Sequence, residues 1–331
     1  MEESSLWTEG TCPSRIECER RKEYPEAIYI MKKVKVIVIL GQTATGKSAL
    51  AVKLAKKLDG EIISADSRQV YKGLDIGTGK ITQKEMKNIS HHLLDVANPK
   101  KKFTVAEYQK KAISAMADIC QRGKIPIICG GTGFYIDAIT KGIIFPEVPP
   151  NEKLRKALYP KSAIALFEYL KKIDPGRAKN IKDKNEINNK VRLVRAIEIA
   201  KTLGKVPSLK YDTKSAYAEN VSLGKKYKFI KIGLYLPPEK LKKKVEKRVA
   251  KMFTDGLLKE IQKLKKKGVS KKRLKEFGFE YYSPTYEKVV SGTLKYAKRQ
   301  MTWFKRDKDI KWFDASKKSP PSCILRDFIL F

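Results

Sequence analysis

Residues 41 to 48 of the chain read GQTATGKS, which fits the Gly-x-x-x-x-Gly-Lys-Ser pattern of a phosphate-binding loop. The short, β-branched apolar run Val34–Leu40 precedes this loop, and an amphipathic segment at Ser48–Leu58 follows it. A buried strand, a glycine-rich loop and a helix in this order are the context that gives the pattern its meaning. The feature therefore restricts the chain to open α/β folds built on a parallel sheet.

Strands and helices keep alternating in the first half of the chain. EIISAD at 61–66 is a second strand, and Ile125–Cys129 is a third. Between them, Thr104 and Glu107 form a capping box that opens a helix, which Gly123 ends. This alternation predicts an α/β fold with a P-loop NTPase-like, doubly wound parallel sheet.

A helical region interrupts the alternation. Residues from about 150 to 205 have helical spacing without a strand pattern, a strand returns at 228–236, and the chain to about 306 is again mostly helical. We therefore expect a discontinuous P-loop core with C-terminal helices, an inserted all-helical domain, a disordered N-terminal extension and a tail. The core is assigned to residues 31–140 and 223–315, and the inserted domain to residues 141–222. The N-terminal extension is residues 1–30, and the tail is residues 316–331.

The charge of the chain indicates its partner. Among 331 residues, 72 are Lys or Arg and 36 are Asp or Glu, so the net charge is +36. Such an excess favours nucleic acid, although a lysine-rich solvated surface gives the same number. No apolar run approaches the roughly 20 residues of a membrane span, and the five cysteines form no CxxC pair. We expect a cytoplasmic protein with reduced thiols and no membrane partner.

The loop residues are suited to hold a diphosphate. Gly41 and Gly46 permit backbone conformations that point N–H groups at an anion, and Lys47 adds a positive charge. Ser48 can hold Mg²⁺ at the start of the helix. A phosphate loop alone is compatible with kinases, ATPases and other transferases.

Further polar residues follow the second and third strands. Asp66 is expected at the C-terminal edge of the sheet, where it fits a general base as well as a turn or helix-cap aspartate. Thr132 in GGTGFY can approach the same pocket. The only histidines, His91 and His92, fit a structural turn, and we assign catalysis to neither.

Two basic regions in the second half of the chain are candidates for phosphate or RNA contacts. Arg248 lies near the apolar stripe of the helical segment 241–261, as expected of a phosphate ligand or of a snorkelling surface side chain. Residues 293–313 interleave aromatic and basic side chains. That composition suits stacking on RNA, and equally suits an amphipathic helix that docks on the core.

Seven segments together resemble the tRNA dimethylallyltransferase family, also called tRNA isopentenyltransferases. In chain order they are GQTATGKSAL, ISADSRQVYKGLDIGTGK, HHLLDV, GGTGFY, VRLVRAIEIAKTLGK, RVAKMFTDGLLKE and YAKRQMTWFKR, and the likeness extends from Lys33 to about Phe313. The resemblance implies transfer of a dimethylallyl group from dimethylallyl diphosphate to the exocyclic amine of the adenosine 3′-adjacent to the anticodon. The implied acceptors are tRNAs that read U-initial codons, Mg²⁺ is the implied cofactor, and diphosphate leaves. The expected partner is the tRNA anticodon stem-loop, and we expect a monomer.

The same resemblance assigns roles to residues. Asp66 is the general base, and Thr43 and Arg248 complete the catalytic set. The residues expected at the diphosphate are Gly41, Gln42, Thr43, Ala44, Thr45, Gly46, Lys47, Ser48 and Thr132, with Ser48 also at the Mg²⁺. The residues expected at the tRNA are Asp66, Ser67, Arg68, Gln69, Val191, Arg192, Leu193, Val194, Arg195, Lys275, Glu276, Phe277, Gly278, Phe279, Glu280, Lys298, Arg299, Gln300, Trp303 and Lys305.

The chain departs from the family pattern at three places. Gln42 stands where the family usually has Pro, Gly79 where it has Ala, and FGFEY at 277–281 where it has a sequence close to IGYKE. The first two changes keep a plausible backbone geometry. Glu280 in place of Lys puts the RNA contact at that position in doubt.

Three other activities share part of the pattern. A small-molecule or nucleoside kinase would share the loop and could use Arg177, Arg192 and Arg195 as a lid. An RNA-binding ATPase would share the loop and the charge, and an adenylate isopentenyltransferase would use a free nucleotide as the acceptor. The position of Asp66, the long collinear match and the basic C-terminal region favour tRNA as the acceptor.

Overall fold

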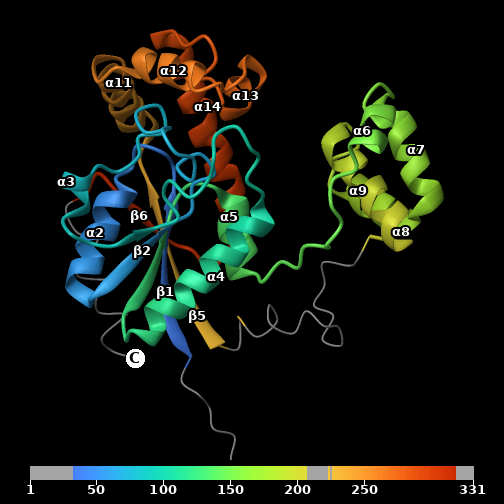
Figure 1. Ribbon diagram of the computed structural model, residues 1–331. Helices are drawn as coiled ribbons and strands as arrows, with labels where there is room; N and C mark the ends of the chain where they lie inside the picture. Colours follow the sequence, from blue (N-terminus) through green and yellow to red (C-terminus); the bar gives the residue numbers. More distant parts are fainter. Residues whose placement is uncertain (1–32, 207–222, 224–225, 318–331) are drawn as a thin grey trace, which may run out of the picture. The chain divides into compact units, whose positions relative to one another are not determined.

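The structure is a computed structural model, and it describes residues 33–206, 223 and 226–317 (Figure 1). The chain divides into two units, Met1–Lys33 and Val34–Phe331, and the features below belong to the second. The expectations for residues 1–30, and for the tail beyond its first two residues, lie outside the described residues.

Six parallel strands form one sheet, in the order β3-β2-β4-β1-β5-β6. This confirms the predicted doubly wound parallel sheet. Because β4 lies between β2 and β1, the C-terminal ends of these three strands are neighbours, and each one leads into a predicted site segment. The strands are β1 (Val34–Gly41), β2 (Gly60–Ser64), β3 (His91–His92), β4 (Ile125–Cys129), β5 (Tyr227–Tyr235) and β6 (Lys311–Asp314).

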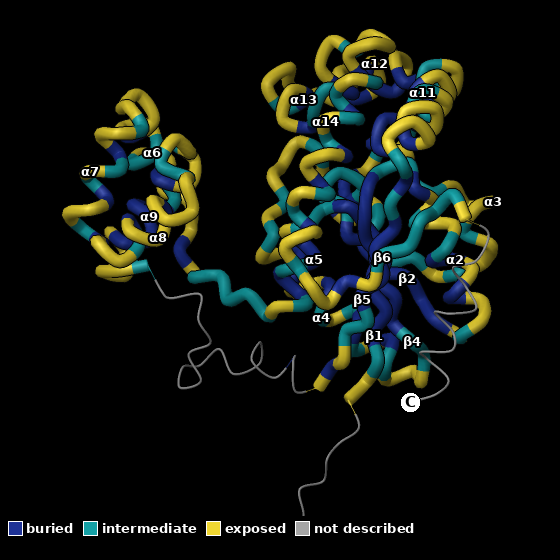
Figure 2. Tube along the Cα trace, turned by 180° about the vertical axis from the view of Figure 1, so that it is seen from behind, coloured by how far each residue is buried: buried dark blue, intermediate teal, exposed yellow. Residues whose placement is uncertain are grey.

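Helices cover both faces of the sheet (Figure 1). Successive side chains of a strand point to opposite faces of the sheet. In β1, Val36 and Val38 therefore pack in the core that contains α4 and α5, whereas Ile37 and Ile39 pack in the core that contains α2. The strands therefore form a buried centre, and exposed residues lie on the outward sides of the helices (Figure 2). The helices beside the sheet are α2 (Lys47–Leu58), α3 (Gln83–Met86), α4 (Val105–Gln121) and α5 (Gly133–Thr140).

Local signals placed several boundaries correctly. The capping box of α4 is confirmed, since the Thr104 hydroxyl accepts from the N–H of Glu107 and the Glu107 carboxylate accepts from the N–H of Thr104. Two strands escaped prediction, because β3 has two residues and β6 has four, which is too short for a periodic pattern. His91 and His92, which fitted a turn, pair with β2 at the edge of the sheet.

Residues 152–203 form four helices with a core of their own. That core contains Leu166 and Leu170 of α7 and Leu193 and Ile197 of α9. These residues are thus helical, as their spacing predicts, while an inserted domain with the limits 141 and 222 stays a prediction; residues 207–222 lie outside the described part. The helices are α6 (Glu152–Leu158), α7 (Ala163–Ile173), α8 (Pro175–Asp183) and α9 (Lys190–Leu203).

Four C-terminal helices follow β5. The segment 241–261, predicted as one helical stretch, lies in two helices, because the chain breaks at Gly256 with a left-handed φ of 101°. Val245 and Val249 of α11 pack against Val289 and Ala297 of α14. Within the described residues, no helix is long and apolar enough to cross a membrane. The helices are α11 (Pro238–Thr254), α12 (Leu257–Lys266), α13 (Lys271–Phe277) and α14 (Tyr286–Phe304).

Candidate active site

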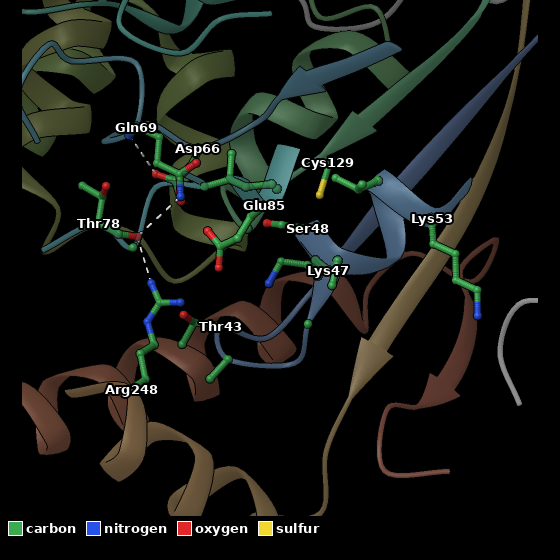
Figure 3. Close-up of a pocket in the computed structure, with 18 of the residues that line it drawn as sticks. Thr43, Lys47, Ser48, Lys53, Asp66, Gln69, Thr78, Glu85, Cys129 and Arg248 are labelled. Carbon is green, nitrogen blue, oxygen red and sulfur yellow. Dashed lines mark hydrogen bonds between the residues drawn. The ribbon is translucent and has the colours of Figure 1, made fainter. Parts of the chain in front are cut away.

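A cavity of about 940 Å³ opens where β1, β2 and β4 end. The phosphate loop, Asp66, the turn at Thr78 and Gly79, and Arg248 all line it, although they come from four separate parts of the chain (Figure 3). The structure thus brings together the predicted base, the predicted diphosphate loop and the predicted arginine.

The phosphate loop is fixed to the neighbouring strand β5. A Cβ on Gly41 would lie 2.1 Å from the carbonyl oxygen of Leu234, and the φ of Gly41 is 129°, so glycine is required there. Gln42 donates its N–H to the Leu234 carbonyl at 3.3 Å, and its side-chain oxygen accepts from the N–H of Leu236 at 3.2 Å. A proline at position 42 could form neither bond, so this departure from the family pattern has a clear local role.

Inside the loop, two groups fold back on the Gln42 carbonyl. The Thr45 hydroxyl and the Lys47 ammonium both donate to it. The pKa of Lys47 is lowered to about 8, chiefly by burial. Arg248 also acts to lower it, whereas Cys129 and Asp66 act to raise it. A bound anion would favour the charged form of this lysine. Ser48 lines the cavity at the first turn of α2.

Asp66 is held by its own turn. One carboxylate oxygen accepts from the N–H of Arg68 at 2.9 Å and from the N–H of Gln69 at 3.3 Å. The Thr132 hydroxyl accepts from the N–H of Ser67 at 3.0 Å, so it supports this turn. From the GGTG segment the cavity is lined by Gly130 and Gly131, whereas Thr132 faces the Asp66 turn.

Arg248 points from α11 into the cavity, and is not a snorkelling surface side chain. One of its terminal nitrogens donates to the carbonyl oxygen of Thr78 at 2.9 Å. Burial and the neighbouring Arg68 lower the pKa of Arg248. Gly79 lies against the guanidinium: its φ is 58°, and a Cβ there would be 2.1 Å from the nearest nitrogen, so the arginine side chain would have to shift to admit it.

Arg68 forms an ion pair inside the protein. Its guanidinium lies 2.7 Å from the carboxylate of Glu280, a buried residue, and 5.5 Å from the centre of the Tyr296 ring. Burial acts to lower the pKa of Arg68, but Glu280 and Asp66 outweigh it and raise the pKa. The departure at position 280 therefore supplies a counter-ion for a residue of the cavity wall.

The C-terminal helix α14 has two different faces. Gln300 is 5% exposed; its side chain accepts from the N–H of Thr43 at 2.8 Å and donates to the carbonyl of Gly131 at 2.9 Å. Trp303 donates its ring N–H to Asp137. In contrast, the predicted RNA contacts Lys298, Arg299 and Lys305 are exposed. The structure thus assigns Gln300 to the wall of the cavity.

The other predicted RNA residues are also divided by burial. In α9, Val191 and Arg192 are exposed, Arg195 pairs with Glu198, and the side chains of Leu193 and Val194 are inside the helical core. In the segment 275–280, the exposed residues are Lys275 and Glu276, the half-buried residues are Gly278 and Phe279, and the buried residues are Phe277 and Glu280. The side chains that can reach a partner in this conformation are the exposed ones.

A phosphate loop that faces a carboxylate and two arginines in one cavity of a P-loop fold is the arrangement of an enzyme that acts on a phosphorylated substrate. A family model of IPP transferases matches residues 69–307. The tRNA dimethylallyltransferase of Anoxybacillus flavithermus is 41% identical over 293 residues, which cover 85% of this chain and 90% of that protein. The tRNA dimethylallyltransferase of Halothermothrix orenii is 40% identical over 317 residues, with 89% and 94% covered. The chain belongs to the tRNA dimethylallyltransferase family.

Solved structures agree with this assignment. The full-length tRNA isopentenylpyrophosphate transferase of Bacillus halodurans superimposes with a TM-score of 0.63 and 31% identity, and covers 90% of this chain and 96% of that one. A eukaryotic dimethylallyltransferase, solved acting on tRNA, superimposes with a TM-score of 0.71 and 27% identity, with 90% and 80% covered. The predicted family is therefore confirmed, and it is favoured over the kinase and adenylate-transferase alternatives.

Proposed function

We propose that the protein transfers a dimethylallyl group from dimethylallyl diphosphate to the exocyclic amine of the adenosine 3′-adjacent to the anticodon, in tRNAs that read U-initial codons. The observation that carries this proposal is the single cavity shared by Asp66 and the phosphate loop. A loop for the leaving diphosphate and a carboxylate for the attacking amine are the two groups that this alkyl transfer requires.

The phosphate loop acts on the leaving group. As the allylic carbon–oxygen bond breaks, negative charge builds on the bridging oxygen of the diphosphate. The loop N–H groups, Lys47 and Arg248 are placed on the cavity wall, where they stabilise that charge more strongly than the ground state. A single fixed donor of this kind is worth about 3 kcal/mol at comparable sites.

The donor set at the loop fits Mg²⁺. Ser48, Asp66 and Glu85 line the cavity, and among the described residues no group of three or more His, Cys, Asp or Glu could enclose a metal. Mg²⁺ usually takes one or two protein oxygens and completes its shell with water and phosphate oxygens, so a sparse set is suitable. Ser48 would hold the ion, which would neutralise part of the diphosphate charge.

Asp66 acts on the acceptor. The adenine amine forms a bond to the allylic carbon, the diphosphate leaves with the electron pair of the broken bond, and the amine proton passes to the Asp66 carboxylate. Hydrogen bonds from Arg68 and Gln69 occupy one oxygen of that carboxylate and set its orientation. A base that is already oriented avoids the cost of ordering it at the moment of transfer.

The exposed cations serve the tRNA. The adenine must leave the stack of the anticodon loop, which costs a few kcal/mol, and backbone contacts must offset that cost. Positive charge is present at the surface for this purpose on Lys298 and Arg299 of α14, on Lys305 directly after α14, and on Arg192 of α9. We propose that the protein acts as a monomer on one anticodon stem-loop.

Transfer of label tests the proposal directly. The purified protein is incubated with Mg²⁺ and radiolabelled dimethylallyl diphosphate, with an unmodified tRNA that reads U-initial codons in one tube and AMP in another. We expect label in the tRNA, at the adenosine 3′-adjacent to the anticodon, and its loss when EDTA removes Mg²⁺. Label in AMP alone would replace tRNA by a free nucleotide as the acceptor, and label in neither would refute the proposal.

A further inference from the structure

A buried carboxylate outside the cavity binds one of the cavity walls. Glu260 of α12 is 8% exposed, and its two oxygens accept from three successive backbone N–H groups, those of Asp75 at 3.0 Å, Ile76 at 2.7 Å and Gly77 at 3.1 Å. Successive N–H groups that converge on one point form an anion-binding nest. In this protein the anion is a side chain of the protein itself, from 183 to 185 residues further along the chain.

Tyr281 completes the shell of this carboxylate. Its hydroxyl donates to Glu260 at 2.8 Å, and burial together with Glu260 raises the pKa of Tyr281 well above its usual value, so the hydroxyl keeps its proton. The Tyr281 ring also packs on the loop: a Cβ on Gly77 would lie 2.7 Å from it. The loop at 75–77 is thus held by a charge-assisted nest and by an aromatic ring, both from the C-terminal helical region.

The same loop continues directly into the cavity. The carbonyl oxygen of Thr78 accepts from Arg248 at 2.9 Å and from the side chain of Gln69 at 3.4 Å. The N–H of Gln69 in turn donates to the Asp66 carboxylate. Figure 3 shows these bonds as one connected path from Arg248 through Thr78 and Gln69 to Asp66.

We propose that Glu260 is a positioning residue for the transfer reaction: by binding the N–H groups of residues 75–77, it sets the place of the Thr78 carbonyl, and through it those of Arg248 and Asp66. The inference rests on the proposed transfer activity. Glu260 does not line the cavity, so it acts through the loop. Loss of its negative charge leaves three N–H groups without their shared acceptor, and the Thr78 carbonyl moves away from Arg248 and Gln69.

Glu260→Gln tests this with the smallest change of shape. One amide oxygen cannot serve the donors that two carboxylate oxygens serve, and the amide NH₂ would face N–H groups. We expect kcat for tRNA prenylation to fall about 30-fold, since a misplacement of about 1 Å can cost about 100-fold, while the Kd for tRNA changes less than twofold. The matched control is Glu246→Gln on α11, whose carboxylate forms no ion pair with another described residue; its kcat should equal that of the wild type.

Coupling to Arg248 separates a positioning role from a purely structural one. If Glu260 acts through Arg248, the losses of kcat caused by Glu260→Gln and by Arg248→Lys are not additive in free energy. The kcat of the double variant is then only slightly lower than that of Arg248→Lys alone. A structural role would give multiplied losses, or a lower Tm with unchanged kcat. Glu246→Gln with Arg248→Lys supplies the additive reference.

Two further measurements keep the proposal testable if Glu260→Gln folds poorly. Tyr281→Phe removes one hydrogen bond from the carboxylate and should lower kcat by about threefold, in the same direction and without change in tRNA affinity. Amide hydrogen exchange of the peptide that spans residues 72–80 should be faster in both variants. Wild-type kcat with Glu260→Gln or Tyr281→Phe overturns the inference, whereas absence of transfer by the wild type overturns the proposed function instead.

Discussion

Neutralising Glu280 should destabilise the protein, because it leaves Arg68 without its counter-ion. The two groups are 2.7 Å apart, and their side chains are 5% and 21% exposed for Glu280 and Arg68, respectively. At an effective dielectric constant of about 20, such a pair attracts by about 6 kcal/mol. Loss of solvation on burial offsets part of this, and removal of one partner from a buried pair costs about 3–5 kcal/mol. We take about 3 kcal/mol for Glu280→Gln because Arg68 keeps some contact with water.

This loss is measurable by urea denaturation and by the thermal transition in circular dichroism. A loss of about 3 kcal/mol lowers Tm by about 4 °C in a chain of this size. The control is Glu276→Gln in the same segment, since Glu276 pairs with Arg273 at 2.7 Å with its side chain 31% exposed, and surface pairs contribute about 1 kcal/mol or less. If Glu280→Gln were no less stable than Glu276→Gln, the inferred role of Glu280 as counter-ion to Arg68 would be refuted.

Three other predictions concern the reaction. Asp66→Ala should abolish transfer and leave tRNA affinity nearly unchanged, because it removes the base and no phosphate ligand; turnover near the wild-type value would contradict this role. The pKa of Lys47 is lowered to about 8, and a bound diphosphate raises that pKa because it favours the charged form. KM for the donor should therefore be constant below pH 8 and rise above pH 8 by up to about tenfold per pH unit. A KM that does not change from pH 7 to 10 would contradict this prediction. Reversing the charges of Lys298 and Arg299 should weaken tRNA binding. The slope of the binding constant against salt concentration should decrease by the amount that corresponds to about two phosphate contacts, as titrations at several salt concentrations would show.

The parts of the fold that follow from short-range signals were predictable from sequence. The phosphate loop, the capping box of α4 and the strands β1, β2 and β4 each depend on residues within about ten positions of one another. The break between α11 and α12 at Gly256 was not predicted, because apolar residues at helical spacing continue on both sides of this glycine.

The sequence predicts the position of a site residue only where that residue follows a strand of the parallel sheet. Asp66 and the phosphate loop meet because their strands end at the same edge of one sheet. The contacts of Gln300 and Glu260 connect residues 169 or more positions apart, and no spacing rule signals such a pair. Gln300 was therefore grouped with the RNA-binding cations of its own segment, although the helix turns its amide inward to Thr43 and Gly131.

The effect of each departure from the family pattern depends on the group that the new side chain contacts. From sequence, Glu280 implied only the loss of a cation beside RNA. In the structure its carboxylate neutralises Arg68. Gln42 likewise stands in place of a rigid proline and forms two hydrogen bonds, one with Leu234 of β5 and one with Leu236 directly after that strand. Each change is compensated by a group in the same chain, so neither weakens the cavity. The adjacent residues Glu280 and Tyr281 then reach Arg68 and Glu260, respectively, so one short segment after α13 supports two walls of the site.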